Sequence, residues 1–304
     1  MSSVNENLLA LLDQANQIIF GKEQPIRLAV CCLLAKGHLL IEDVPGVGKT
    51  TLASTLARLL GLDYQRIQFT SDLLPADIVG GAIFRGDQQM FEFRPGPIFR
   101  QMILADEINR ATPRTQSALL EAMEERQVTV DGMTYPLPEP FYVIATQNPH
   151  HYSGTFSLPE SQLDRFLMRI ELGYPDPQAE RTLLMSPARQ SVLHDQPALF
   201  SVAELLQLQE AVAAVYVSAP LLDYVLAIIG YTRHSGEYPN GLSPRAGLAL
   251  LQAARAWALL DGRDAVIPED VQAVLPAVAG HRIGGGASHS GLIVAGVLKN
   301  VPLY

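Results

Sequence analysis

A glycine-rich turn follows an apolar segment near the start of the chain, and this pairing constrains the fold more than any other feature. Residues 39–51 read Leu-Leu-Ile-Glu-Asp-Val-Pro-Gly-Val-Gly-Lys-Thr-Thr, which predicts a strand, a loop and the start of a helix. Gly46 and Gly48 allow backbone N–H groups to point at phosphate, and the helix adds its positive dipole end. Lys49 would reach the β- and γ-phosphates, and the Thr50 hydroxyl would ligate Mg²⁺.

The sequence therefore predicts a phosphate-binding loop for a nucleotide. The candidate contacts are Pro45, Gly46, Val47, Gly48, Lys49, Thr50 and Thr51. Asp43 stands where the pattern G-x-x-x-x-G-K-[ST] has its first glycine, and we discount this mismatch because that position touches phosphate least. The alternative is a chance match, but the preceding strand and the helical spacing of apolar residues from Leu52 to Leu60 supply the expected context.

Composition allows a folded α/β protein and disfavours several other classes. The 304 residues suffice for one large domain and a smaller one, and 48% of them are hydrophobic against 17% charged. The net charge of −9 disfavours sequence-independent binding to nucleic acid. No apolar run approaches the ~18 residues of a membrane span, and no secretory signal pattern precedes the first helix, so we expect a cytoplasmic protein. Cys31 and Cys32 are adjacent, which favours buried packing over a disulfide or a metal site.

Four segments have the character of strands, namely 38–42, 64–69, 102–106 and 141–147. Three are continuously apolar, which is typical of a parallel sheet covered by helices on both faces. Two further segments, 81–93 and 127–137, predict β-hairpins, each with a Gly/Asp turn. Helical spacing dominates after the sequence Gly-Tyr-Pro-Asp-Pro at 173–177. We therefore expect an α/β core over residues 1–175 and a small all-helical domain over 176–304.

Two carboxylates close the apolar strand at 102–106, and an amide follows the strand at 141–147. Asp106 would hold Mg²⁺ through its water shell, and Glu107 would polarise an attacking water. The alternative is an acidic N-cap of the next helix, but a second buried strand some sixty residues after the phosphate loop favours hydrolysis. Asn148 is a candidate sensor of the γ-phosphate, and a plain Asn-Pro turn is its alternative.

Four motifs in order carry a family resemblance over nearly the whole chain. The phosphate loop, Leu-Ala-Asp-Glu-Ile-Asn-Arg-Ala at 104–111, Ala-Thr-Gln-Asn-Pro at 145–149 and Leu-Pro-Glu-Ser-Gln-Leu-Asp-Arg-Phe at 158–166 resemble the MoxR family of AAA+ ATPases. The resemblance implies a P-loop core with two hairpin inserts, a helical lid, and ATP and Mg²⁺ as cofactors.

The resemblance also gives Arg165 a role that spacing alone does not. It occupies the place of an arginine finger, which would reach the γ-phosphate held by a neighbouring subunit. An ion pair with Asp164 or Glu160 on the same helix is the alternative. Arg110 and Arg114 are weaker candidates for the same role.

Arg245 matches the second sensor, an arginine of the lid that closes over the nucleotide. A surface arginine is the alternative, but a helix N-terminus does not favour a cation, which argues for an anionic partner.

The resemblance implies a homo-oligomeric ring, expected to be a hexamer, that remodels or activates a partner protein complex. A separate protein with a von Willebrand A domain would be the partner, and insertion of a metal or cofactor is one related role. A nucleic-acid motor of the same clade is an alternative, but the hairpin at 127–137 carries no basic residue. A nucleotide-dependent switch with negligible hydrolysis is another, and the intact Asp106 and Glu107 argue against it.

Overall fold

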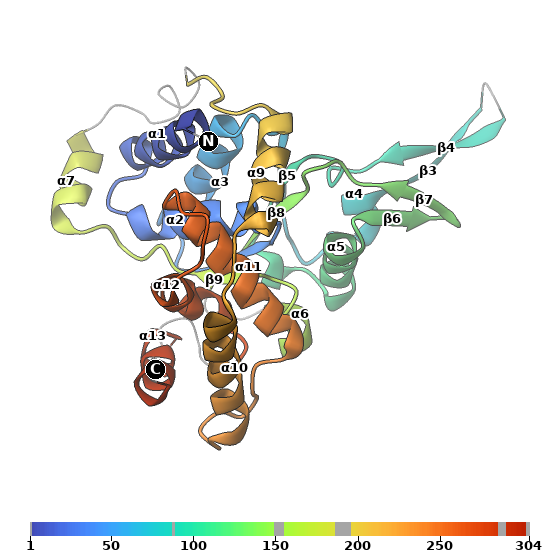
Figure 1. The fold of residues 1–304 in the computed structure, drawn as a ribbon. Coiled ribbons are helices and arrows are strands. Elements are labelled where there is room, and N and C mark those ends of the chain that lie inside the picture. The colour runs from blue at the N-terminus through green and yellow to red at the C-terminus, as the bar shows by residue number, and fades with distance from the viewer. Residues whose placement is uncertain (1, 87–88, 149–154, 186–195, 285–289, 302–304) are drawn as a thin grey trace.

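A parallel five-stranded sheet forms the centre of the molecule. The computed structural model describes residues 2–86, 89–148, 155–185, 196–284 and 290–301 (Figure 1). The strand order is β2-β5-β8-β1-β9, with all neighbours parallel. The strands are β1 (Leu39–Glu42), β2 (Tyr64–Gln68), β5 (Met102–Asp106), β8 (Tyr142–Gln147) and β9 (Met168–Ile170). The predicted α/β class is confirmed, and β9 is an additional strand that the sequence did not predict.

Both faces of this sheet are covered by helices, as the apolar strands predicted. Along β1, Leu39 and Ile41 belong to one apolar cluster and Leu40 belongs to the other. The first cluster includes residues of α1 (Ser2–Ile18), α2 (Glu23–Leu34) and α3 (Lys49–Leu59). The second includes residues of α4 (Pro75–Val79) and α5 (Pro113–Glu125). Cys31 and Cys32 are free and buried in α2, which confirms packing as their role.

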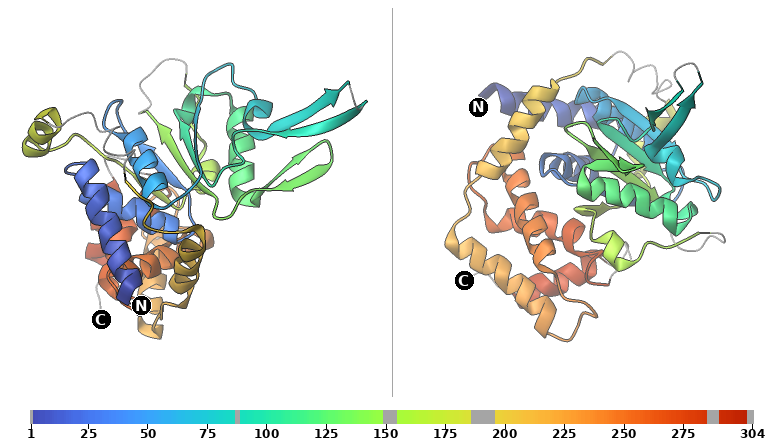
Figure 2. Two further views of the ribbon diagram at one scale, coloured as in Figure 1. Left: turned by 90° about the horizontal axis from the view of Figure 1, so that it is seen from above. Right: turned by 90° about the vertical axis from the view of Figure 1, so that its right-hand side faces the viewer.

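Both predicted hairpins are present and project from the same side of the sheet (Figures 1 and 2). The first pairs β3 (Gly80–Arg85) with β4 (Met90–Pro95), and the second pairs β6 (Gln127–Val130) with β7 (Met133–Pro136). The rings of Phe93 and Tyr135 stack with 3.9 Å between centroids, so the two hairpins contact each other directly.

The described residues after β9 form helices and no strand. The helices are α7 (Pro177–Met185), α9 (Val202–Ala214), α10 (Ala219–His234), α11 (Pro244–Leu260), α12 (Pro268–Ala279) and α13 (Ser290–Asn300). Two of them are fixed against α2, because Gln209 donates to the Leu33 carbonyl and the Cys31 thiol to the Ala253 carbonyl. The helical region therefore packs on the α2 side of the core. Among the described helices, none is both long and apolar enough to cross a bilayer.

Candidate active site

The phosphate loop joins the carboxyl end of β1 to the first turn of α3. Gly46 and Gly48 have φ angles of 86° and 101°, which residues with a side chain rarely adopt, so glycine is required at both. The Lys49 Nζ donates to the Asp43 carbonyl at 2.5 Å and to Asn148 Oδ1 at 3.1 Å. Burial lowers the pKa of Lys49, and the nearby carboxylates of Asp43, Asp106 and Glu107 oppose that shift.

Asp43 has a structural role that explains its departure from the glycine pattern. Its Oδ2 accepts hydrogen bonds from the backbone N–H groups of Leu172 and Gly173, at 2.7 and 2.6 Å, and its Oδ1 accepts from Val44. Asp43 thereby ties the phosphate loop to the segment that leaves β9 toward the helical region. Lys22 donates to the Tyr174 carbonyl in the same segment, at 2.7 Å.

We expect Asp43→Gly, which restores the usual pattern, to lower the free energy of unfolding by about 2–3 kcal/mol, because buried N–H groups lose a charged acceptor. Urea denaturation measures this change. Asp72→Gly is the matched control, since Asp72 is exposed and its substitution removes none of these bonds. Equal stability of the Asp43→Gly variant and the wild type would contradict this role for Asp43.

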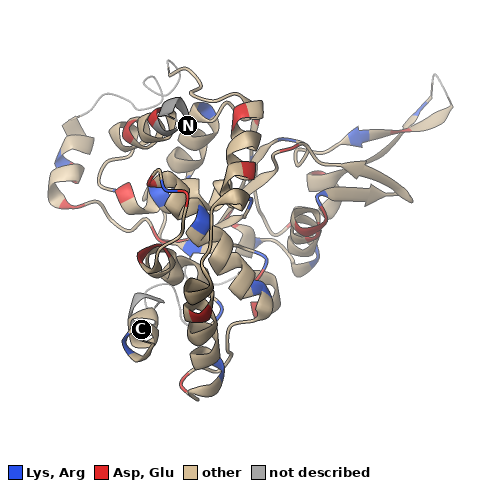
Figure 3. Cartoon of the chain, in the orientation of Figure 1, with Lys and Arg blue, Asp and Glu red and all other residues tan. Residues whose placement is uncertain are grey.

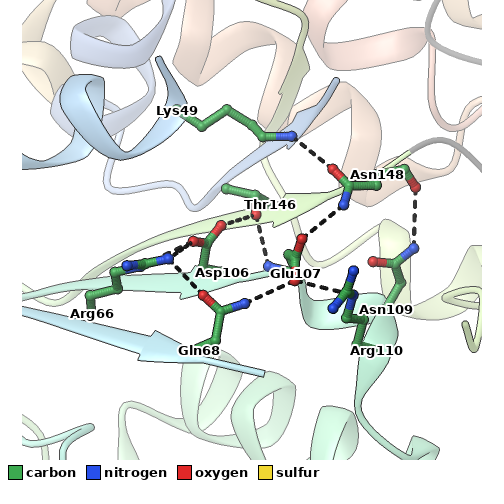
Figure 4. Close-up of polar contacts among 9 residues, drawn as sticks. All are labelled: Lys49, Arg66, Gln68, Asp106, Glu107, Asn109, Arg110, Thr146 and Asn148. Atoms are coloured by element: carbon green, nitrogen blue, oxygen red, sulfur yellow. Dashed lines mark hydrogen bonds and ion pairs between the residues drawn. The ribbon is translucent and has the colours of Figure 1, made fainter. Parts of the chain in front are cut away.

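Asp106 ends β5 and is held from two sides. Thr146 on the neighbouring strand β8 donates to Oδ1 at 2.6 Å, and Arg66 on β2 donates to Oδ2 at 2.6 and 3.0 Å (Figure 4). The neighbouring strands thus fix the orientation of this carboxylate.

Glu107 follows Asp106 and contacts three side chains, through two hydrogen bonds and one ion pair. Asn148 donates to Oε1 at 3.0 Å, while Gln68 and Arg110 lie 2.9 and 3.1 Å from Oε2 (Figure 4). Its φ of 58° is uncommon outside glycine, and its N–H donates to Thr146 Oγ1. A strained backbone that is held by tertiary contacts is typical of a functional position.

Arg66 and Gln68 contact the two candidate carboxylates, Asp106 and Glu107, and the sequence did not reveal these contacts. They alternate on the edge strand β2, and Gln68 pairs in register with Asp106 of β5. Two polar residues at positions i and i+2 near the end of a strand indicate that polar contacts form on one face of the sheet. This pattern does not identify the residues that they contact.

Most of the predicted loop and carboxylate residues line one pocket of about 370 Å³. They are Pro45, Gly46, Gly48, Lys49, Thr50, Thr51, Asp106, Glu107 and Asn148. Val47 is not among them, and its side chain instead packs against the apolar core. The Thr50 hydroxyl and the Asp106 carboxylate are hard oxygen donors in this pocket, which is the donor type that Mg²⁺ prefers.

Arg165 and Arg245 do not line the phosphate pocket. They line a separate pocket of about 350 Å³, which also includes Gly37 and His38 just before β1. Because the strands are parallel, this pocket lies at the amino edge of the sheet, opposite the phosphate loop. Arg245 is therefore not placed to close over a nucleotide bound by its own chain, since the helical region packs on α2.

The ion pair of Arg165 is not the one considered as the alternative to a finger, which was with Asp164 or Glu160. Arg165 lies 3.1 Å from Glu124 of α5, and Arg245 lies 2.9 Å from the same carboxylate. Asp164 is instead paired with Arg282, and Glu160 accepts from Asn240. In this structure the anion beside Arg245 is the Glu124 carboxylate.

The two weaker finger candidates lie elsewhere. Arg110 pairs with Glu107 of its own chain, and Arg114 is exposed in the first turn of α5.

Comparison with known proteins agrees with this geometry. Residues 38–168 match the model of the ATPase family associated with various cellular activities (AAA), and residues 231–295 match the AAA lid domain. The protein named chaperone MoxR1 from Mycobacterium tuberculosis is 44% identical over 280 residues, which are 89% of this chain and 74% of that protein. The protein named MoxR from Paracoccus denitrificans is 34% identical over 297 residues, covering 88% and 86%.

A solved structure of a Cytophaga hutchinsonii protein superposes with a TM-score of 0.87 at 34% identity, covering 99% of this chain and 96% of the other. Since sequence relatives and the fold agree over almost the full length, the chain belongs to the MoxR family of AAA+ ATPases.

Proposed function

We propose that this protein is a Mg²⁺-dependent ATPase. The observation that carries the proposal is the Asn148 amide, which contacts Lys49 through Oδ1 and Glu107 through Nδ2 (Figure 4). One side chain thus connects the cation that binds phosphate with the carboxylate that polarises water, as a sensor of the γ-phosphate requires. Bound Mg²⁺ would be held by Thr50 and, through water, by Asp106, and would neutralise phosphate charge.

Arg165 and Arg245 act, in this proposal, on ATP bound by a neighbouring subunit. Their pocket is at the opposite edge of the sheet from the phosphate loop, so head-to-tail association would bring the two edges together. Guanidinium groups suit this role because their forked donors match phosphate oxygens. A closed ring of such contacts, which we propose to be a hexamer, would complete every site.

The output of hydrolysis in this proposal is the remodelling or activation of a partner protein complex in the cytoplasm. Support comes from the relative named a chaperone and from the projecting hairpins, where the exposed rings of Phe84 and Phe91 pair near one tip. Strands β6 and β7 carry no charged residue, which does not suit a nucleic-acid motor (Figure 3).

The resemblance to the MoxR family supports two further details of the proposal, the partner protein and the form of activation. A separate protein with a von Willebrand A domain is the proposed partner, and metal or cofactor insertion is one form the activation would take. The proposed division into a core of residues 1–175 and a lid of 176–304 agrees with the change from strands to helices after β9.

The test is hydrolysis by mixed subunits. Lys49→Ala and Arg165→Ala should each be almost inactive alone, because an arginine finger contributes about 10³–10⁵-fold to the rate. In a one-to-one mixture, about a quarter of the interfaces pair an intact Lys49 with an intact Arg165, so about a quarter of the wild-type rate should return. The rate per subunit should also rise with protein concentration and then reach a plateau.

Arg181→Ala is the matched control for the arginine, since Arg181 is exposed on α7 and should be dispensable. A mixture that stays inactive, under conditions where wild-type protein assembles, would refute action between subunits.

A further inference from the structure

One carboxylate contacts both Arg165 and Arg245 in the pocket at the amino edge of the sheet. Glu124 Oε2 lies 3.1 Å from Arg165 Nε, and Glu124 Oε1 lies 2.9 Å from Arg245 Nη2. The arginines come from distant parts of the chain, one just before β9 and one in the first turn of α11. Glu124 therefore joins an arginine of the core to an arginine of the helical region, with one oxygen for each.

The charges around this pair favour a carboxylate between the two arginines. The cations that line the pocket are Lys36, Arg126, Arg165, Arg245 and Arg282. Of the two carboxylates in the lining, Asp164 is taken by Arg282 at 2.6 Å, and Glu124 contacts Arg165 and Arg245. Because like charges at short range repel, an anion between two guanidinium groups lowers the free energy of holding them together.

The position of Glu124 is itself fixed to the sheet. The His38 ring accepts a hydrogen bond from the Val143 N–H at 3.0 Å, and its other nitrogen lies 3.2 Å from the Met123 carbonyl, next to Glu124. Burial lowers the pKa of His38 to about 3, so the ring stays neutral and makes both bonds. An acidic residue in the last turn of a helix is unfavourable for the helix dipole, and the two arginines offset that cost for Glu124.

The contacting atoms indicate whether Glu124 would compete with a phosphate or act alongside it. Glu124 contacts Arg165 through Nε and Arg245 through Nη2, one nitrogen of each guanidinium group. A guanidinium has five N–H donors in a rigid fork, so each arginine keeps donors for an incoming anion. Phosphate and Glu124 can therefore be bound by these arginines at the same time.

We propose that Glu124 is a positioning residue that holds Arg165 and Arg245 as one preformed unit for the triphosphate of ATP bound by a second copy of this chain. This inference rests on the proposed function. The Arg165 and Arg245 side chains are 29% and 50% exposed, so without Glu124 they would be free to move away from each other. Catalytic donors act best when they are preorganised, and small misplacements lower rates strongly.

Steady-state ATP hydrolysis by assembled protein tests the proposal, with Glu124→Ala, Glu124→Gln and, as matched control, Glu125→Gln from the same helix. Glu124→Ala should lower kcat by about 10–100-fold, because the displaced arginines lose contacts made in the transition state, while KM for ATP and particle mass stay unchanged, since the phosphate loop that binds ATP is intact. Glu124→Gln should fall between Glu124→Ala and wild type, since its amide oxygen still accepts from an arginine. Glu125→Gln should match wild type.

A combined variant separates positioning from general damage. If Glu124 acts through these arginines, Glu124→Ala should reduce the rate by less than about twofold when it is added to a double variant that lacks both, Arg165→Ala with Arg245→Ala. Losses that multiply, or an unchanged or raised kcat in Glu124→Ala while Arg165→Ala is slow, would overturn the inference and leave the proposed function standing. Wild-type rates in both Arg165→Ala and Arg245→Ala would instead refute the part of the proposed function in which these arginines act on ATP of a neighbouring subunit.

Discussion

Glu107→Gln should bind ATP with nearly wild-type affinity and hydrolyse it about 10²–10⁴-fold more slowly. The substitution keeps the shape of the side chain and an oxygen that can accept from Asn148, but it removes the carboxylate that we propose as the base that polarises water. The phosphate loop is unchanged, so binding should persist. Single-turnover hydrolysis gives the rate, and titration with a fluorescent ATP analogue gives Kd.

The same variant should keep the proposed ring assembled in ATP, because the nucleotide at each proposed interface would no longer be consumed. Glu121→Gln is the matched control, since Glu121 is an exposed acid of α5 and lies outside the phosphate pocket. Normal turnover by Glu107→Gln would mean that another group polarises the water, which would remove Glu107 from the mechanism proposed here.

Local sequence signals were sufficient for the phosphate loop and the carboxyl ends of β5 and β8. Each of these depends on a short apolar run followed by residues with particular backbone or chemical requirements, such as Gly48 or Asp106. The hairpins were also predictable, because alternation and a Gly/Asp turn lie within a dozen residues. Strand β9 was not, since a three-residue strand has too few positions to show a pattern.

Contacts between residues far apart in the chain could not be predicted from local sequence patterns. Asp43 appeared to be a tolerated mismatch, but its carboxylate binds N–H groups 129 and 130 positions away. Arg66 meets Asp106 across 40 positions, and only the pairing of β2 with β5 brings them together. Such pairings depend on strand order, which local periodicity does not determine.

The location of Arg245 depends on how the helical region packs. The sequence matched it to a lid arginine but did not indicate which face of the core the helices cover. Bonds from Gln209 to the Leu33 carbonyl and from Cys31 to the Ala253 carbonyl set that arrangement. They are buried contacts between helices far apart in the chain, so only the tertiary structure places Arg245 beside Glu124.

Lys49→Ala should raise the Kd for ATP by about 30-fold or more. Removing one partner from a buried contact between charges typically costs about 2–5 kcal/mol, and each 1.4 kcal/mol is tenfold in affinity. Lys49 lies in the first turn of α3 and is only 8% exposed, so no solvent-exposed cation can readily replace it in the pocket. Isothermal titration with ATP and Mg²⁺ measures the change.

Two variants make the Lys49 result decisive. Lys49→Met keeps most of the side-chain volume without the charge, so it should bind ATP as weakly as Lys49→Ala if charge rather than packing is responsible. Lys299→Ala removes an exposed lysine from α13 and should bind like wild type. Near wild-type affinity in Lys49→Met would show that the cation is dispensable. Phosphate binding would then depend on the loop N–H groups and the α3 dipole alone, and the contact between Lys49 and Asn148 could not serve to report the γ-phosphate.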